Sequence, residues 1–191
     1  MRVFSAVYDK VILWSKHKRA TWYLAGLSFS ESSFLPFPPP DVMLAPMVLA
    51  RMNLAWKLAL ITTIFSVLGG LFGYLIGMLA FEIVMPLIID AGYWPYYEKT
   101  QKWFTDYGVW AVIVAGFSPI PYKVFTLAAG VSGMAIIPFL IASLVGRGAR
   151  FFLVAGFIVL GGAKMEHLLR QYIDWLGWLV VVIVILVILI I

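Results

Sequence analysis

The sequence lacks cysteine and is poor in charge. None of its 191 residues is cysteine, which excludes disulfides, thiolate nucleophiles and thiolate metal sites. Charged residues make up only 12% of the chain and hydrophobic residues 63%, with a mean hydropathy of +1.00. A soluble domain carries about 25% charged and about 45–50% apolar residues. Because a soluble core of this size cannot bury so much apolar surface, we expect an integral membrane protein.

Histidine and the common catalytic motifs are also scarce. His17 and His167 lie far apart in the chain, and there is no HExxH motif, no nucleophile elbow and no glycine-rich phosphate loop. We therefore expect no metal site, no cofactor and no enzymatic activity. The net charge of +5 is interpreted as basic cytoplasmic loops, and no nucleic-acid partner is expected.

Long uncharged runs predict the membrane-spanning helices, since a crossing needs about 20 apolar residues. Residues 58–81 are uncharged over 24 positions and are expected to span. A second crossing is expected over residues 137–163, and residues 164–191 are expected to form a C-terminal linker and transmembrane helix. Residues 1–19 combine basic residues with apolar ones at helical spacing. They predict an amphipathic helix on the cytoplasmic leaflet, with an extended tail as the alternative.

Two proline-rich segments interrupt the remaining apolar stretches, which are too short or too broken to cross the membrane comfortably. Consecutive prolines cannot stay helical, because each lacks an N–H and restricts the residue before it. Residues 20–50 and 107–130 are therefore predicted to be re-entrant hairpins whose tips face each other or a shared cavity. Two spanning helices with proline kinks are the alternative. The tip residues are Pro38, Pro39, Pro40, Pro119 and Pro121.

The expected fold is an all-α polytopic membrane protein with an internal repeat. Each half of a membrane core at residues 20–163 has a hairpin followed by a transmembrane helix, and the two halves enter from opposite sides. The basic N-terminal segment and the basic loop at 51–57 are expected to be cytoplasmic by the positive-inside rule. Inverted repeats with broken helices are typical of secondary transporters, which bind substrate at the repeat interface.

Four sequence motifs resemble those of a known family: ESSFLPFPPPD, GFSPIPYK, GVSGM and GRGAR. They are similar to the DedA family, also called the VTT-domain or SNARE-associated family, with its YqaA-like branch the most similar. The resemblance covers roughly residues 27–160. It implies two facing re-entrant hairpins, essential acidic and arginine residues within the membrane, and movement of phospholipids or polyprenyl-phosphate carriers across the bilayer. We accordingly expect the inner membrane of a bacterium, with a cytoplasmic N-terminus.

Glu31 and Asp41 match the acidic positions of the family in type and neighbourhood. The usual family motif has an arginine before the second tip and another just after its proline. This chain has no arginine near Gly116, and Lys123 stands where the second arginine would fall.

Five charged residues of this core are expected at membrane depth: Glu31, Asp41, Lys123, Arg147 and Arg150. Unpaired, they would cost on the order of 10–15 kcal/mol, so they must be paired or hydrated. Lys123, Arg147 and Arg150 are predicted to form a cationic pocket for a phosphate, which arginine grips with two parallel N–H groups. Glu31 and Asp41 are candidates for proton exchange. The alternative is that these two carboxylates simply pair with the arginines and hold the hairpins together.

A glycine stripe adds a packing prediction, and the whole pattern gives a function. Gly69, Gly73 and Gly77 are expected to allow close helix approach, with a substrate groove as the alternative. The predicted function is a flippase or scramblase for a phospholipid or polyprenyl phosphate, with protons as the candidate coupling ion. The alternatives are a structural or chaperone-like protein that maintains the envelope, and an intramembrane enzyme acting on a lipid phosphate.

Overall fold

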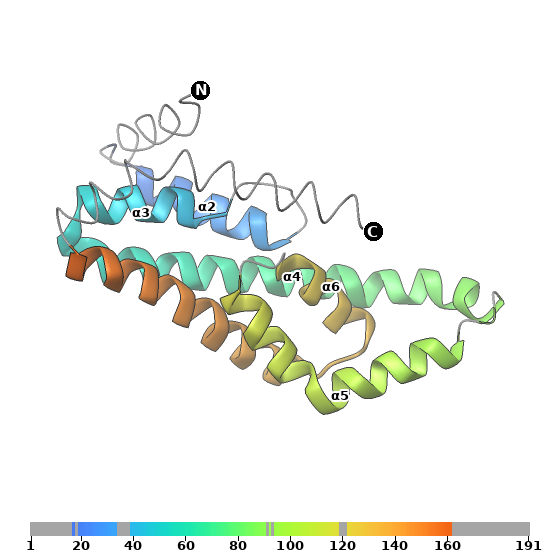
Figure 1. Cartoon of the computed structure of the whole chain (residues 1–191). Helices are drawn as coiled ribbons and strands as arrows, with labels where there is room; N and C mark the ends of the chain where they lie inside the picture. The colour runs from blue at the N-terminus through green and yellow to red at the C-terminus, as the bar shows by residue number, and fades with distance from the viewer. Residues whose placement is uncertain are drawn as a thin grey trace, which may run out of the picture.

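The structure is a computed structural model that describes residues 17, 19–33, 39–90, 92, 94–118 and 122–161. Within these residues the chain forms helices and no strand, as the all-α prediction requires (Figure 1). Residues 1–16, the C-terminal segment 164–191, and Pro38, Pro119 and Pro121 lie outside the described residues. The elements are α2 (Ala20–Ser33), α3 (Asp41–Ala50), the short 3-10 helix η1 (Met52–Leu54), α4 (Ala55–Asp90), α5 (Trp94–Phe117), α6 (Tyr122–Val131) and a last helix, Ile136–Gly161.

Two of the described helices are long and apolar enough to cross a membrane. They are Met52–Ile83, which combines η1 with most of α4, and Ile136–Gly161, with mean hydropathies of 2.0 and 1.7. Only 33% and 28% of the most apolar 18-residue stretch of each helix is buried inside the protein. A helix that is apolar all round and yet mostly uncovered is suited to a lipid environment.

The other described helices come in two pairs, and three of their four arms are short. α3 and α6 have 10 residues each, so each is about 15 Å long, half of a bilayer core. α5 is longer than the predicted arm, because it begins at Trp94 and not near residue 107. Its additional turns carry exposed charged residues such as Lys99 and Lys102. The predicted arm began at residue 107 because the uncharged stretch that defined it covers only the apolar part of this helix.

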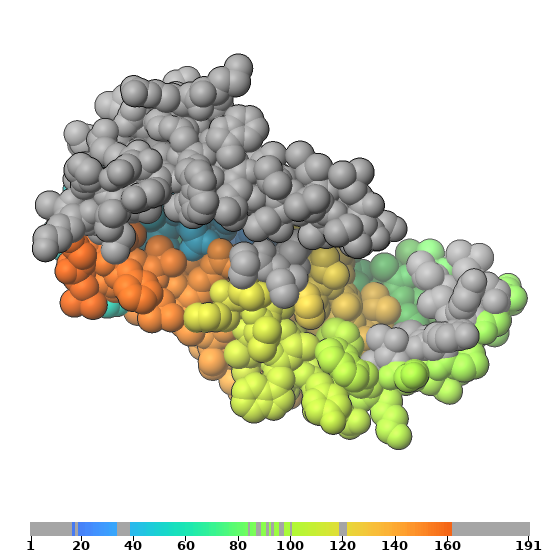
Figure 2. All heavy atoms as spheres, viewed as in Figure 1, coloured from blue at the N-terminus to red at the C-terminus, as the bar shows by residue number. Residues whose placement is uncertain are grey.

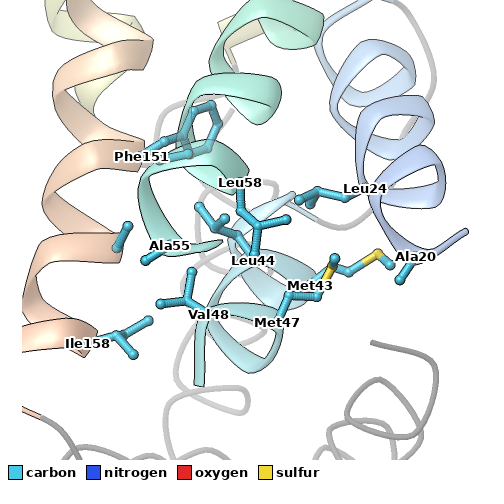
Figure 3. Close-up of a cluster of buried hydrophobic side chains, with 12 residues drawn as sticks. Ala20, Leu24, Met43, Leu44, Met47, Val48, Ala55, Leu58, Phe151 and Ile158 are labelled. Atoms are coloured by element: carbon cyan, nitrogen blue, oxygen red, sulfur yellow. The ribbon is translucent and has the colours of Figure 1, made fainter. Parts of the chain in front are cut away.

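A buried apolar cluster joins the first helix pair to one end of the two long helices (Figure 3). Ala20 and Leu24 of α2 lie in the same cluster as Met47 of α3, so the base of both arms lies at the same end of α4. The cluster also contains the first residues of α4 and the far end of the last helix: Ala55, Leu58, Ala59, Phe151, Ala155 and Ile158. The two long helices therefore run antiparallel, as Figure 1 also shows.

A second buried apolar cluster joins the other helix pair to the opposite end. Phe104 and Val112 of α5 and Ala129 of α6 share it with Tyr74 of α4 and Phe139 near the start of the last helix. The Tyr74 hydroxyl donates a hydrogen bond of 2.5 Å to the Met134 carbonyl, just beyond α6. Each helix pair is thus joined to the long helices by its own cluster, and the second cluster extends to Tyr122 at the start of α6.

Glycines on one stripe of α4 bring both pairs close to that helix. A Cβ at Gly69 would meet the backbone of Phe29 on α2, and one at Gly77 would meet the backbone of Leu127 on α6. A Cβ at Gly73 would lie 3.1 Å from the Ser33 carbonyl oxygen and 2.6 Å from the Thr126 hydroxyl. The stripe therefore sets the distance of α4 from both tips.

We expect alanine at Gly69 or Gly77 to destabilise the protein by about 1–3 kcal/mol, because the new methyl group meets backbone that cannot move aside. The matched control is Gly26→Ala on α2, where nothing lies within 4 Å. That control should be neutral or raise stability by up to about 1 kcal/mol. Thermal unfolding in detergent measures all three variants. Equal unfolding midpoints would show that the helices next to α4 can accommodate the added methyl groups, which would contradict the prediction.

Candidate functional site

Arg147 lies between the two apolar clusters, near the middle of the last helix. It is only 2% exposed, although it carries a full positive charge. Its Nη2 donates to the Glu31 carboxylate on α2 at 2.6 Å, forming an ion pair, and its Nε donates to the Ser66 hydroxyl on α4 at 2.5 Å. A buried charge is tolerated only when it is paired and hydrogen-bonded, and Arg147 meets both conditions.

Two serines complete the polar surroundings of this ion pair. Nη2 of Arg147 also donates to the Ser32 hydroxyl at 3.0 Å, and the Ser32 and Ser66 hydroxyls lie 2.7 Å apart. Ser32 also donates to the same Glu31 oxygen that accepts Arg147, at 3.0 Å. The network thus ties the end of α2 to the middle of α4 and of the last helix.

Aromatic rings lie against the Arg147 guanidinium. Its central carbon lies 5.0 Å from the centroid of Tyr122, at the start of α6, and 4.8 Å from that of Phe151. Both distances fit cation–π contacts, which gain strength where water is excluded. The Tyr122 hydroxyl donates to Ser143 on the last helix at 2.5 Å. Through Tyr122, the second helix pair also contacts Arg147.

Arg150 lies one helical turn further and contacts one residue beside each proline-rich segment. Its Nε and Nη2 donate to one oxygen of Asp41, Oδ2, at 3.1 and 2.5 Å, and Asp41 is the first residue of α3. Its Nη1 donates to the Ser118 carbonyl, just after α5, at 2.6 Å. Arg150 therefore connects residues beside the two proline-rich tips.

The two ion pairs differ in exposure and in completeness. The side chains of Arg147 and Glu31 are 3% and 16% exposed, whereas those of Arg150 and Asp41 are 19% and 22% exposed. Both N–H groups of Arg150 that face Asp41 share Oδ2, and Asp41 Oδ1 is buried without a hydrogen-bond partner among the described residues. A fork-to-fork arginine–carboxylate pair would use both oxygens. Arg147 also donates to a single Glu31 oxygen, so the Arg150 pair differs in being more exposed and in leaving one buried carboxylate oxygen without a partner among the described residues.

The remaining predicted site residues lie near this centre without sharing its bonds. Lys123 is half-buried, directly after the Tyr122 that contacts Arg147, and makes no ion pair within the described ranges. Pro39 is exposed, and Pro40 is buried as the N-cap of α3. The structure thus brings Arg147 and Arg150 to the tips, each with a carboxylate bound to it.

Sequence reasoning missed Ser32, Ser66, Ser143 and Tyr122. Isolated serines in apolar helices commonly bond to their own backbone, as Ser28 does to the Leu24 carbonyl at 2.7 Å. A usable signal was present, because Ser66 lies in the middle of an uncharged run and Ser32 is next to Glu31. Polar residues at mid-membrane depth on separate helices are candidates for partners of one buried charge.

We expect Arg147→Met to destabilise the protein by about 3–5 kcal/mol, because it leaves the Glu31 charge buried and unpaired. The double variant Arg147→Met with Glu31→Leu should recover most of that loss, since the two serines still bond to each other. Thermal unfolding in detergent of the parent, both single variants and the double variant completes a mutant cycle. A double variant no more stable than Arg147→Met would contradict the pairing.

Comparison with known proteins adds a family to this geometry. A model of the VTT domain matches residues 37–160, more than half of the chain. An uncharacterised protein of Haemophilus influenzae is 48% identical over 177 residues, which cover 93% of this chain and 92% of that one. Undecaprenyl phosphate transporter A of Staphylococcus aureus is 33% identical over 136 residues, 66% of each chain. No solved structure matches the chain. The matching domain model and the nearly full-length relative show that the chain belongs to the VTT-domain family, which is also called the DedA family.

Proposed function

We propose that this protein moves a phosphate-bearing lipid, a phospholipid or a polyprenyl phosphate, from one leaflet of the membrane to the other as a flippase or scramblase. The observation that carries the proposal is Arg150, a partly exposed arginine held between the two tips by an incomplete ion pair. Family membership supports transport. One relative, 33% identical, is named undecaprenyl phosphate transporter A, which supports a lipid phosphate as the substrate.

The proposed membrane arrangement has two re-entrant helix pairs entering from opposite sides. Each pair is fixed by a cluster at one end of the antiparallel long helices, and Arg150 contacts residues beside both tips. α3 and α6, each about 15 Å long, reach only the middle of a core of about 30 Å. Both tips then meet at the bilayer midplane, where transporters with inverted repeats hold their substrates. The proposed location is a bacterial inner membrane, with a cytoplasmic N-terminus.

Substrate binding in this proposal is an exchange of anions on Arg150. Asp41 offers one oxygen to two N–H groups, whereas a phosphate can offer one oxygen to each of them. The headgroup would replace Asp41 on Arg150, and Lys123 would add a point charge from the first turn of α6. Arg147 contributes its positive charge from within its network, since its Nε and Nη2 are already bonded to Glu31 and two serines.

Displacement of Asp41 also offers a route to proton coupling. Its Oδ1 is already buried without a partner among the described residues, and loss of Arg150 would leave the carboxylate without its ion pair. An unpaired buried charge is costly, and uptake of a proton removes it. In this proposal Asp41 takes a proton when the phosphate arrives and releases it when Arg150 returns. Glu31, held in its closed network, is the second candidate for proton exchange.

The test is transport of a fluorescent phosphatidylglycerol, or of a fluorescent polyprenyl phosphate, across liposomes that contain the purified protein. We expect Arg150→Lys to slow transport by about tenfold to a hundredfold, because the bidentate fork is lost while the charge is kept. The matched control is Arg19→Lys, an exposed arginine ahead of α2, which should transport at the parent rate.

The same assay run at several pH values tests the proton step, and Asp41→Asn should make the transport rate independent of pH. Parent-like transport in Arg150→Lys and Asp41→Asn at every pH would remove both residues from the transport path. A loss of thermal stability in Arg150→Lys as large as in Arg147→Met would instead favour the structural or chaperone-like alternative.

Cysteine labelling tests the membrane arrangement in this cysteine-free chain. Asn53 in η1 and Lys99 in α5 are exposed and lie beyond opposite ends of the uncharged run at residues 58–81. We expect an impermeant thiol reagent added to intact cells to label Lys99→Cys but not Asn53→Cys, and inverted vesicles to give the reverse. Labelling of Asn53→Cys from outside intact cells would overturn the first re-entrant pair.

A further inference from the structure

An open groove of about 400 Å³ lies between α5 and α6, outside the charged centre. Its walls are almost entirely apolar and include three large aromatic side chains of α5, whose surface is yellow-green in Figure 2. Trp103, Tyr107 and Trp110 are 47%, 56% and 67% exposed, so these rings border an accessible surface. The other main lining residues are Ala111 and Val114 of α5 and Phe125 of α6.

The groove leads to the Arg150 site. Trp103, Tyr107, Ala111 and Val114 are spaced by four, four and three residues, so they share one face of α5. The next position on that face is Ser118, whose amide donates to the Val114 carbonyl at 2.8 Å and whose carbonyl accepts Arg150 at 2.6 Å. The inner end of the groove at Val114 therefore lies one helical turn from a residue that Arg150 contacts.

The length of the groove fits one hydrocarbon chain. From Trp103 to Val114 the helix rises about 17 Å, close to half of a bilayer core, which is the depth that one leaflet's chains fill. A hydrocarbon chain gains little by leaving lipid for an apolar wall, so the groove by itself would hold one only by packing. Once a headgroup is bound nearby, the attached chain is present at a high effective concentration and can be ordered there.

We propose that this groove binds one hydrocarbon chain of the anionic lipid whose headgroup is held by Arg150. This inference rests on the proposed function and extends it. The transported ligand is recognised by its chain as well as by its phosphate, and α5 determines which chains fit. The flat rings of Trp103, Tyr107 and Trp110 provide a rigid surface for an extended chain, and Ala111 leaves the space that the chain occupies.

The experiment measures binding of phosphatidylglycerol to the purified protein by native mass spectrometry, with long acyl chains and with short, water-soluble ones. Ala111→Trp fills the groove and should weaken binding of the long-chain lipid about tenfold while leaving the short-chain lipid unchanged. Leu79→Trp is the matched control, because Leu79 is 59% exposed on the apolar part of α4. Trp110→Ala, which removes one wall, should also weaken long-chain binding if Ala111→Trp does not fold.

Equal losses in Ala111→Trp and Leu79→Trp would overturn the inference, because they would indicate unspecific contact with surrounding lipid. A change of oligomeric mass in Ala111→Trp with unchanged lipid affinity would also overturn it and assign the groove to a second copy of the chain. Arg150→Lys should weaken both lipids. If it weakens neither while Ala111→Trp still acts, the chain site stands and the proposed headgroup site fails. If Lys102→Met weakens lipid binding and Arg150→Lys does not, the headgroup lies at the Lys102 end of the groove and the chain points toward Arg150, which is the reverse of the proposed orientation.

Discussion

The burial of the Arg147 charge is the constraint on which the centre of this structure depends. A guanidinium that is 2% exposed in an apolar helix must find anionic and hydrogen-bonding partners. Its neighbours one turn away on its own helix include Arg150 and Phe151 but no carboxylate, so the anionic partner comes from another helix. Glu31 comes from α2, Ser66 from α4 and the Tyr122 ring from α6. One side chain thereby fixes three helices around the middle of a fourth.

Close packing on α4 follows from the same requirement, because short side chains such as serine reach Arg147 only if the helices approach closely. Gly73 is the clearest case, since a Cβ there would meet both the Ser33 carbonyl and the Thr126 hydroxyl. In lipid such contacts gain from packing and hydrogen bonding and little from the hydrophobic effect. The two apolar clusters then act at the ends, where they hold the base of each helix pair and leave the centre to polar groups.

Sequence alone predicted the all-helical fold, the VTT-domain family and both long apolar helices, because uncharged length and proline clusters are local signals. It did not predict which carboxylate joins which arginine. Glu31 and Arg147 are 116 residues apart, and Asp41 and Arg150 are 109 apart, so pairing depends on how four helices meet. It also misjudged the start of α5, because charged turns beyond an apolar run continue the helix. Ser66 was not predicted as a partner of Arg147, because the two residues are 81 positions apart in the chain.

The two ion pairs differ in exposure, and this difference separates the arginine that must stay paired, Arg147, from the one that can change partners, Arg150. Breaking the Arg147 pair would strand a buried charge at a cost of about 3–5 kcal/mol, a large part of a protein's whole stability. A site that exchanges ligands repeatedly needs alternative binding partners whose free energies differ by less than this. Arg150 has them, since it is partly exposed and shares one oxygen of a carboxylate whose other oxygen has no partner among the described residues. In the proposed exchange a phosphate would accept the two Arg150 N–H groups that now donate to Asp41, while Arg147 keeps the helices that surround it in place.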